Sequence, residues 1–294
     1  MLSHPKIIEN TPLQEISLSL FQEKGVQVWV KRDDLTGKDI QGNKWRKLKY
    51  NLVEAKNQQK ATLLTFGGAY SNHIHAVAGA GALFGFKTIG IIRGEEHLPL
   101  NKTLAYAQSR DMELHYLNRT KYREKNQVDF LKKICQQFDN PYIIPEGGTN
   151  EFALAGCTEM VEEIEIDFDY LCLPCGTAGT LAGAILGLKE HQKAIGFSVL
   201  KGKDFLEQEV EQLIGKKYTN WEINWNYHFG GYAKKKPELL DFMQHFHEQT
   251  EILLEPIYTG KLFFGVLDLI KKGYFEEGSK IVLVHTGGLQ GIQG

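Results

Sequence analysis

The sequence has little that would place it outside the class of soluble globular proteins. It has no sustained basic run and a net charge of −2, so nothing indicates a nucleic-acid partner. Its longest nearly apolar stretch, residues 76–86, is too short to span a bilayer. The first residues lack the basic and then apolar segments of a signal peptide. These absences predict a soluble, cytoplasmic protein with no membrane partner.

Cysteine is also scarce, since four cysteines in a chain of 294 residues do not form a disulfide scaffold. Cys172 and Cys175 match the C-x-x-C spacing. No second pair exists, and Cys172 falls in a predicted strand, which argues against zinc or redox chemistry. His73 and His75 lie two positions apart on a predicted helix, so their rings point to different sides and cannot share a metal. We therefore predict no metal site.

What the sequence does contain is a regular alternation of short apolar runs with helical segments. Such alternation predicts parallel βαβ units and therefore an α/β fold. The expected strands are 61–66, 87–92, 113–117, 141–145, 170–173, 194–200 and 280–284. The expected helices are 45–59, 72–84, 103–110, 128–138, 151–164, a small-residue helix ending at 188, 204–214, 238–250 and 262–272. The segment 218–236 is expected to be irregular, with its tryptophans used in packing.

Glycine-rich turns follow several of these strands, and in a parallel sheet such turns gather at the carboxyl edge, where ligands bind. The most informative turn is CGTAGT. Gly176 and Gly179 allow a close approach of the backbone to a ligand, and Thr177 and Thr180 add hydroxyl donors. The next helix points its free N–H groups at the same place, which suits a phosphate. The turn matches neither a Walker A loop nor G-x-G-x-x-G, and a purely structural role is equally compatible with it.

The stretch QGNKWRKLKY has four cations at the start of a predicted helix. Asn43 is a suitable N-cap. Lys44 falls in the first turn, where the helix dipole disfavours a positive charge. Arg46, Lys47 and Lys49 fit the exposed face of an amphipathic helix. Lys44 is therefore the cation that needs a separate explanation.

Five segments spread over nearly the whole chain form a specific set: VKRDDLTGKDIQGNKWRKL (Val30–Leu48), GGAYSNH (Gly67–His73), CGTAGT (Cys175–Thr180), YTGK (Tyr258–Lys261) and VHTGG (Val284–Gly288). With these segments the sequence resembles the pyridoxal-phosphate enzymes of fold type II, which have the tryptophan synthase β-like fold. Within them, it resembles the branch of 1-aminocyclopropane-1-carboxylate deaminase and D-cysteine desulfhydrase. The resemblance implies two three-layer αβα domains with mostly parallel sheets. Residues 1–49 and 146–294 would form the large cofactor domain and 50–145 the small domain, and a homodimer is expected.

The resemblance also implies which residues bind the cofactor, pyridoxal 5'-phosphate. Lys44 would bind it covalently, and Asn72 would hydrogen-bond its ring hydroxyl. Thr286 would lie near its pyridine ring. The phosphate would be held by the turn after the strand 170–173, that is by Gly176, Thr177, Ala178, Gly179 and Thr180.

The substrate would lie beside the cofactor. Ser71, with Asn72 and His73, would face the carboxylate or the reacting carbon of a small amino acid. Tyr258 would stand over the substrate. Tyr232 would be a second tyrosine at the site, although its surroundings, FGGYAKK, depart from the family's pattern.

Two threonines bear on the reaction. The deaminases carry Glu after the active-site tyrosine and Leu in the C-terminal turn, whereas this sequence has Thr259 and Thr286, which resembles the desulfhydrases. A carboxylate beside the pyridine nitrogen keeps that nitrogen protonated and makes the cofactor a strong electron sink, which opening a cyclopropane ring requires. A threonine hydroxyl can donate to an unprotonated nitrogen, and the weaker sink suffices for a thiolate to leave. The sequence leaves open which threonine contacts the nitrogen.

The resemblance therefore favours α,β-elimination that converts D-cysteine into pyruvate, hydrogen sulfide and ammonia. The Lys44 amine would remove the α-proton, assisted by Tyr258 or Ser71, and the helix dipole would help this amine towards neutrality. The preference for the D-isomer comes from the resemblance alone. The alternatives are 1-aminocyclopropane-1-carboxylate deamination and a non-catalytic relative that binds pyridoxal phosphate.

Overall fold

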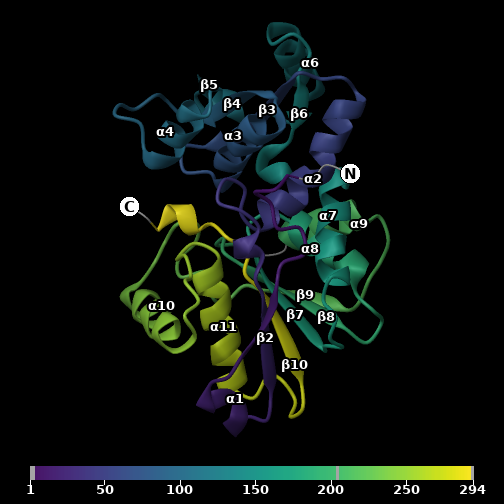
Figure 1. Cartoon of the computed structure of the whole chain (residues 1–294), viewed down its shortest axis with the longest axis vertical. Coiled ribbons are helices and arrows are strands. Elements are labelled where there is room, and N and C mark those ends of the chain that lie inside the picture. Colours follow the sequence, from purple (N-terminus) through teal and green to yellow (C-terminus); the bar gives the residue numbers. More distant parts are fainter. Residues whose placement is uncertain (1–3, 203–204, 293–294) are drawn as a thin grey trace.

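The computed structural model describes residues 4–202 and 205–292, and it contains two sheets, one above the other in Figure 1. The larger sheet has the order β1 (Leu13–Ile16), β2 (Gln27–Lys31), β10 (Lys280–Val284), β7 (Tyr170–Cys175), β8 (Lys193–Ser198) and β9 (Trp221–Asn224). The smaller sheet has the order β5 (Met112–Leu117), β4 (Lys87–Arg93), β3 (Thr62–Gly68) and β6 (Tyr142–Ile144). Strand β1 is antiparallel to β2, and the other pairs are parallel. The predicted α/β fold with mostly parallel sheets is confirmed.

Helices cover both faces of the larger sheet. The side chains of β10 alternate between two cores, with Ile281 and Leu283 in one and Val282 and Val284 in the other. The first core also receives α1 (Ser19–Glu23), α10 (Pro237–Thr250) and α11 (Thr259–Lys271). The second receives α7 (Glu151–Glu162), α8 (Gly179–Gly187) and α9 (Phe205–Ile214). Strands buried on both faces explain the apolar runs in the sequence.

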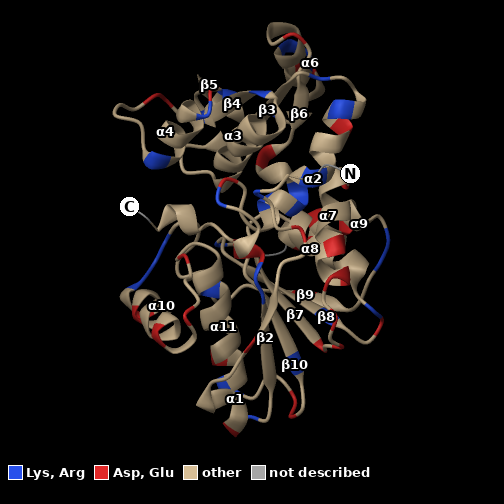
Figure 2. Ribbon diagram, viewed as in Figure 1, with Lys and Arg blue, Asp and Glu red and all other residues tan. Residues whose placement is uncertain are grey.

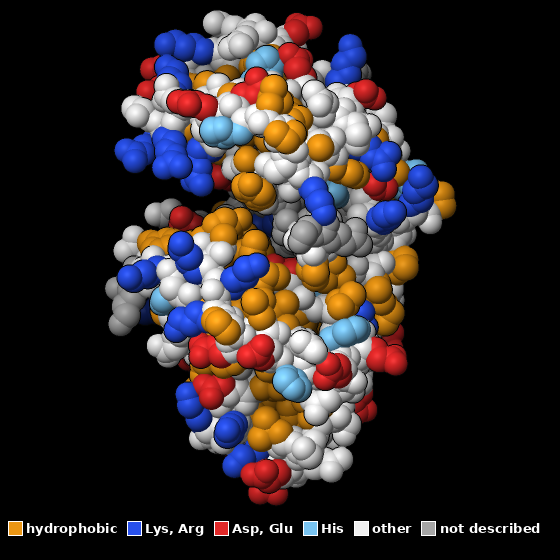
Figure 3. Space-filling view, turned by 90° about the vertical axis from the view of Figure 1, so that its left-hand side faces the viewer, with side chains coloured by type: hydrophobic (Ala, Val, Ile, Leu, Met, Phe, Trp, Pro, Cys, Tyr) orange, Lys and Arg blue, Asp and Glu red, His pale blue; other side chains and the backbone are white. Residues whose placement is uncertain are grey.

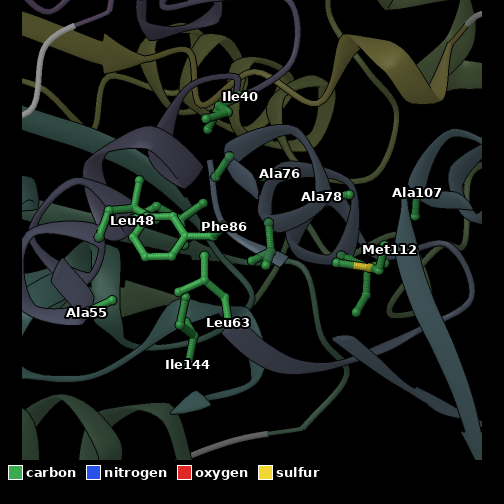
Figure 4. Close-up of a cluster of buried hydrophobic side chains, with 14 of the residues drawn as sticks. Ile40, Leu48, Ala55, Leu63, Ala76, Ala78, Phe86, Ala107, Met112 and Ile144 are labelled. Carbon is green, nitrogen blue, oxygen red and sulfur yellow. The ribbon is translucent and has the colours of Figure 1, made fainter. Parts of the chain in front are cut away.

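The smaller sheet is layered in the same way. Leu63 packs into a core with α2 (Asn43–Asn57), α3 (Asn72–Phe84) and α4 (Lys102–Ser109), in which Phe86 lies beside Leu48 (Figure 4). Leu64 and Phe66 point to the opposite core, which contains α5 (Arg119–Tyr122) and α6 (Val128–Gln137). Short 3-10 turns complete the described part of the chain: η1 (Asp33–Leu35), η2 (Glu146–Gly148) and η3 (Leu289–Gly291).

The predicted elements after residue 60 are present with small shifts at their ends, and α3 and β10 have the predicted bounds. The expected first residue of the helix 204–214 lies outside the described residues. The region before residue 41 contains β1, α1 and β2, which were not predicted, and β9 lies in the segment expected to be irregular. Trp221, in β9, packs against the second core of the larger sheet, in agreement with a packing role.

Two predictions about α2 are wrong. Asn43 is the first helical residue rather than the N-cap, which is Gly42. Arg46, Lys47 and Lys49 do not form an exposed face, because all three side chains are buried. The periodic pattern assigns cations to solvent, but α2 packs against α7, whose carboxylates meet this face. Figure 2 shows these Lys and Arg residues of α2 in the middle of the molecule.

A buried ion-pair network ties α2 to the larger sheet. The Arg46 guanidinium donates to both Asp33 carboxylate oxygens, at 2.9 and 3.0 Å, and to Glu163 just beyond α7. Lys31, in β2, donates to the same Glu163 carboxylate at 2.7 Å. Lys49 pairs with Glu159 at 2.8 Å. Because these charges are held away from water, each depends on its partner.

We expect Arg46→Met to lower the free energy of unfolding by about 3–5 kcal/mol, because the buried Asp33 carboxylate loses its partner. Urea denaturation followed by circular dichroism measures this change. The control is Lys132→Met, which removes an exposed ion pair with Asp129 and should change stability by less than about 0.5 kcal/mol. Equal effects of the two substitutions would contradict a stabilising role for the network.

Candidate active site

A cavity of about 460 Å³ lies where the carboxyl ends of strands from both sheets meet. Figure 3 shows the surface hollowed between the two halves of the molecule. The predicted site residues that line the cavity are Lys44, Ser71, Asn72, His73, Gly176, Thr177, Thr180, Tyr232, Tyr258 and Thr286. Ala178 and Gly179 are buried in the turn behind Thr177. The structure therefore brings the predicted residues together around one space.

Lys44 is positioned by the glycine two residues before it. Gly42 has φ +57°, and a β-carbon there would lie 1.9 Å from the backbone oxygen of Thr286. A side chain at this position would therefore push the start of α2 away from the C-terminal turn. Asn43 donates to the Thr180 hydroxyl at 3.0 Å, which ties the same point to the turn after β7. Lys44 consequently lies between the turns that follow β7 and β10.

The Lys44 amine has a pKa well below that of an ordinary lysine. Burial, together with the positive charge of Lys47, lowers its pKa to about 7. At neutral pH a substantial fraction of this amine is therefore unprotonated, whereas an ordinary lysine is almost fully charged. An unprotonated amine facing a cavity can act as a nucleophile towards a carbonyl or as a base.

Lys47 is a functional candidate that the sequence analysis missed. Its Nζ donates to the backbone oxygen of Gly147 at 3.2 Å and to the hydroxyls of Thr149 and Thr177, both at 3.1 Å. Among the described residues no carboxylate pairs with it, and burial lowers its pKa. A buried cation without an anion is costly, so the site favours an anionic ligand beside Thr177. The signal was the three-residue spacing from Lys44, which places both lysines on one helix face.

The turn between β7 and α8 has the shape of an anion cradle. A β-carbon on Gly176 would lie 2.9 Å from the Tyr258 ring, and one on Gly179 would lie 2.8 Å from the Thr149 side chain. Glycine therefore keeps open the space in front of the turn. The first N–H groups of α8 have no partner within the helix. With Lys47 behind the turn, this arrangement fits a phosphate group.

Ser71 and Asn72 present donors from the start of α3. The Ser71 hydroxyl oxygen accepts the N–H groups of His73, at 3.2 Å, and Ile74, at 3.3 Å, so its own proton is free to donate into the cavity. The Asn72 side-chain oxygen accepts from Gln290 at 2.9 Å, which leaves the Asn72 amide N–H₂ as a donor. Gln290 was also missed, because nothing in the local sequence connects residues 218 positions apart.

His73 is neutral in this environment. Its Nε2 lies 2.8 Å from the Thr65 hydroxyl, which itself donates to the Ile144 backbone oxygen, so Nε2 carries the proton. Burial lowers its pKa well below the ordinary value, with the charges of Lys44 and Lys47 acting in the same direction. Its Nδ1 has no hydrogen-bond partner among the described residues. The neighbouring His75 ring instead stacks on another side chain, so the two histidines point apart, as their spacing predicted.

Tyr258 stands at the start of α11. The Glu255 carboxylate accepts the N–H groups of Ile257 and Tyr258, both at 2.8 Å, and so holds the turn that presents the tyrosine. The Tyr232 ring meets the Tyr258 ring edge to face, with centroids 6.1 Å apart. Burial, with a contribution from Tyr232, raises the pKa of Tyr258 well above its usual value. Its hydroxyl is therefore a proton donor at neutral pH.

The two threonines considered above lie in different surroundings. The Thr259 hydroxyl accepts the Glu255 backbone N–H at 3.0 Å and is fully buried in the start of α11. Thr286 lines the cavity directly after β10. This geometry favours Thr286 as the residue that meets a ligand ring.

Residues 4–202 and 205–292 contain no cluster of His, Cys, Asp and Glu side chains that would bind a metal ion. They also contain no helix of the length and apolarity needed to cross a membrane.

The two cysteines with C-x-x-C spacing lie apart. Cys172 and Cys175 pack on opposite faces of the larger sheet, and burial raises the pKa of both thiols.

Comparison with known proteins connects this geometry to one family. The family model described as "Pyridoxal-phosphate dependent enzyme" matches residues 5–287. The bifunctional D-cysteine desulfhydrase/1-aminocyclopropane-1-carboxylate deaminase of Arabidopsis thaliana is 32% identical, over 91% of this chain and 74% of that protein. The D-cysteine desulfhydrase of Yersinia enterocolitica is 27% identical, over 95% and 91%. A crystal structure of an ACC deaminase homologue has a TM-score of 0.84 and 31% identity, over 98% and 93%.

In the ligand-free protein, we expect the Lys44 amine to titrate at about pH 7, because burial disfavours its charge. The pH dependence of its modification by an amine reagent, followed by peptide mass spectrometry, measures this value. Lys47→Met should move the pKa of Lys44 upward, because it removes a neighbouring positive charge. The exposed Lys234→Met is the control and should leave the titration in place. A Lys44 amine that stays unreactive up to pH 9 would refute this account.

Proposed function

Because this chain belongs to the family of pyridoxal-phosphate-dependent enzymes, as its motifs predicted, we propose that it catalyses α,β-elimination on a small amino acid. The proposed substrate is D-cysteine, which with water gives pyruvate, hydrogen sulfide and ammonia. One observation carries the proposal. The Lys44 amine has a pKa of about 7, and it lies in one cavity with the anion cradle and the hydroxyl donor Ser71. The names of the Arabidopsis and Yersinia relatives support the choice of D-cysteine.

We propose that the cofactor is held by groups from both sheets. Lys44 would bind it covalently, and Asn72 would donate to its ring hydroxyl. Thr286 would meet its pyridine nitrogen. The turn Gly176, Thr177, Ala178, Gly179 and Thr180 would hold the phosphate, whose charge Lys47 would balance. When bound, pyridoxal phosphate supplies an electron sink for the carbanion at the α-carbon.

The protein's own groups then bind the substrate and move protons. Ser71 would donate its hydroxyl proton to the substrate carboxylate, next to the first turn of α3. The Lys44 amine would remove the α-proton, for which a pKa of about 7 is well matched at neutral pH. The Tyr258 hydroxyl, which stays protonated, would donate to the departing sulfur. Tyr232 packs against Tyr258 and would limit the space for the β-substituent.

The desulfhydrase reaction is preferred to cyclopropane ring opening because this chain has Thr259 where the deaminases carry Glu, and Thr286 at the cavity is not a carboxylate either. A threonine hydroxyl cannot keep the pyridine nitrogen protonated as a carboxylate does, so the electron sink is weaker. A thiolate is a good leaving group and needs less stabilisation than a ring-opening carbanion. Deamination of 1-aminocyclopropane-1-carboxylate is the second candidate, since the Arabidopsis relative is named for both activities. The division into domains at residues 50 and 145, the homodimer and the cytoplasmic location remain predictions.

The protein loaded with pyridoxal phosphate should release pyruvate and sulfide in equal amounts from D-cysteine. Pyruvate is measured by coupling to lactate dehydrogenase and sulfide by methylene blue formation. Two compounds serve as comparisons. L-cysteine is assayed for pyruvate and sulfide, and 1-aminocyclopropane-1-carboxylate is assayed for 2-oxobutyrate. Faster formation of 2-oxobutyrate than of pyruvate would replace the proposal with the deaminase alternative. A cofactor absorption band that no D- or L-amino acid changes, with no product formed, would indicate a non-catalytic binding protein.

Lys44→Ala should lower kcat for D-cysteine by about 10²–10⁴-fold or more, since it removes the base. It should also abolish the absorption band of the covalently bound cofactor. Tyr258→Phe should keep that band and lower kcat less, because the ring is retained and only the donor is lost. Tyr274→Phe, far from the cavity-lining residues, is the control and should match the parent protein. An intact cofactor band in Lys44→Ala would show that another lysine is the anchor.

A further inference from the structure

A second cavity, of about 450 Å³, adjoins the first. The two cavities share Gly68, Ala69 and Arg93 as lining residues. Its other charged or titratable lining residues are Glu95, His97 and Arg119. Figure 3 shows Lys and Arg side chains gathered along the upper lip of the hollow between the two halves of the molecule. The active-site cavity therefore continues into a space with a basic lining.

The topology of the smaller sheet places these arginines beside the catalytic groups. Arg93 ends β4, opposite Gly68 at the end of β3, which leads to Ser71. Arg93 also lies opposite Leu117, the last residue of β5, and Arg119 follows two positions later. Successive strands thus present Ser71, Arg93 and Arg119 in order along one carboxyl edge. The order runs from the first cavity into the second.

Neither guanidinium has a hydrogen bond or ion pair within residues 4–202 and 205–292. Arg32, Arg46 and Arg110, by contrast, each pair with an aspartate. Glu95 lines the same cavity but forms no ion pair with Arg93 or Arg119 in the described part of the chain. Two exposed positive side chains therefore line the second cavity without an internal partner. Guanidinium groups bind carboxylates and other oxyanions through paired N–H donors.

We propose that the second cavity is an anion subsite, formed by Arg93 and Arg119, for the far end of a substrate's β-substituent. This inference rests on the proposed function in one respect, namely that an amino acid occupies the first cavity. D-cysteine would lie within the first cavity and would not reach the second. An amino acid with a longer β-substituent that ends in a carboxylate reaches the subsite and binds more tightly. The substrate class therefore extends beyond D-cysteine to small amino acids with an anionic tail.

The test compares D-2-aminoadipate with D-norleucine, whose side chains have the same length and differ by the terminal carboxylate. Neither has a β leaving group, so binding to the protein loaded with pyridoxal phosphate is measured without turnover, from the absorption change. We expect the Kd of D-2-aminoadipate to be lower by about tenfold at low salt, since one charge-assisted hydrogen bond gives about this factor. The difference should shrink as ionic strength rises.

Arg93→Gln and Arg119→Gln should each remove most of this preference. The matched control is Arg123→Gln, an exposed arginine just past α5 that lines neither cavity, and it should keep the preference. Equal binding of the two compounds, no binding of either, or a preference that both variants retain would overturn the proposal. Bond cleavage plays no part in this experiment. Absence of sulfide release from D-cysteine would therefore contradict the proposed function and leave the subsite result intact.

Discussion

The position of α2 between the two sheets is the constraint on which the rest of the structure depends. Its first turn presents Lys44 to the cavity, and the same helix uses its other cations to hold that position. Arg46 and Lys49 pair with carboxylates in and just after α7, which fixes the helix against the larger sheet. Lys47 reaches the turn that follows β7. One helix therefore determines both where the reactive amine lies and how far it stands from the anion cradle.

This arrangement is electrostatically incomplete without a ligand. Lys44 and Lys47 lie on one helix face, in a region where no carboxylate pairs with either among the described residues, and burial lowers the pKa of both amines. A phosphate in front of the Gly176–Thr180 turn would supply the missing negative charge. In the ligand-free protein, burial and then the charge of Lys47 lower the pKa of the Lys44 amine to about 7, so that part of it is unprotonated, as a base requires.

The sequence predicted the alternating elements well because strands buried on both faces, such as β4 and β10, appear as uninterrupted apolar runs. Motifs that follow strand ends, with the family resemblance, also pointed to part of the cavity lining, but not to Arg93 or Glu146. The prediction failed for Arg46, Lys47 and Lys49, because a helical pattern cannot show that this face packs against α7 and the turn after β7. It also missed β1, β2 and β9 and the contact of Gln290 with Asn72. The contact of Gln290 with Asn72 joins residues 218 positions apart, and β2 pairs with β10 near the other end of the chain.

The two sheet edges contribute different chemistry to one cavity, and this division has a consequence for specificity. In the proposed function, the larger sheet's edge supplies Thr177 and Thr286 for the cofactor, while the smaller sheet's edge supplies Asn72 for the cofactor and Ser71 for the substrate. Arg93 and Arg119 extend the smaller sheet's edge away from the cofactor, because β4 and β5 are the next strands in order. Residues at the ends of β4 and β5 can therefore change which β-substituent is accepted without moving Lys44. On this proposal, the substrate range would be set at the ends of β4 and β5, apart from the groups that bind the cofactor.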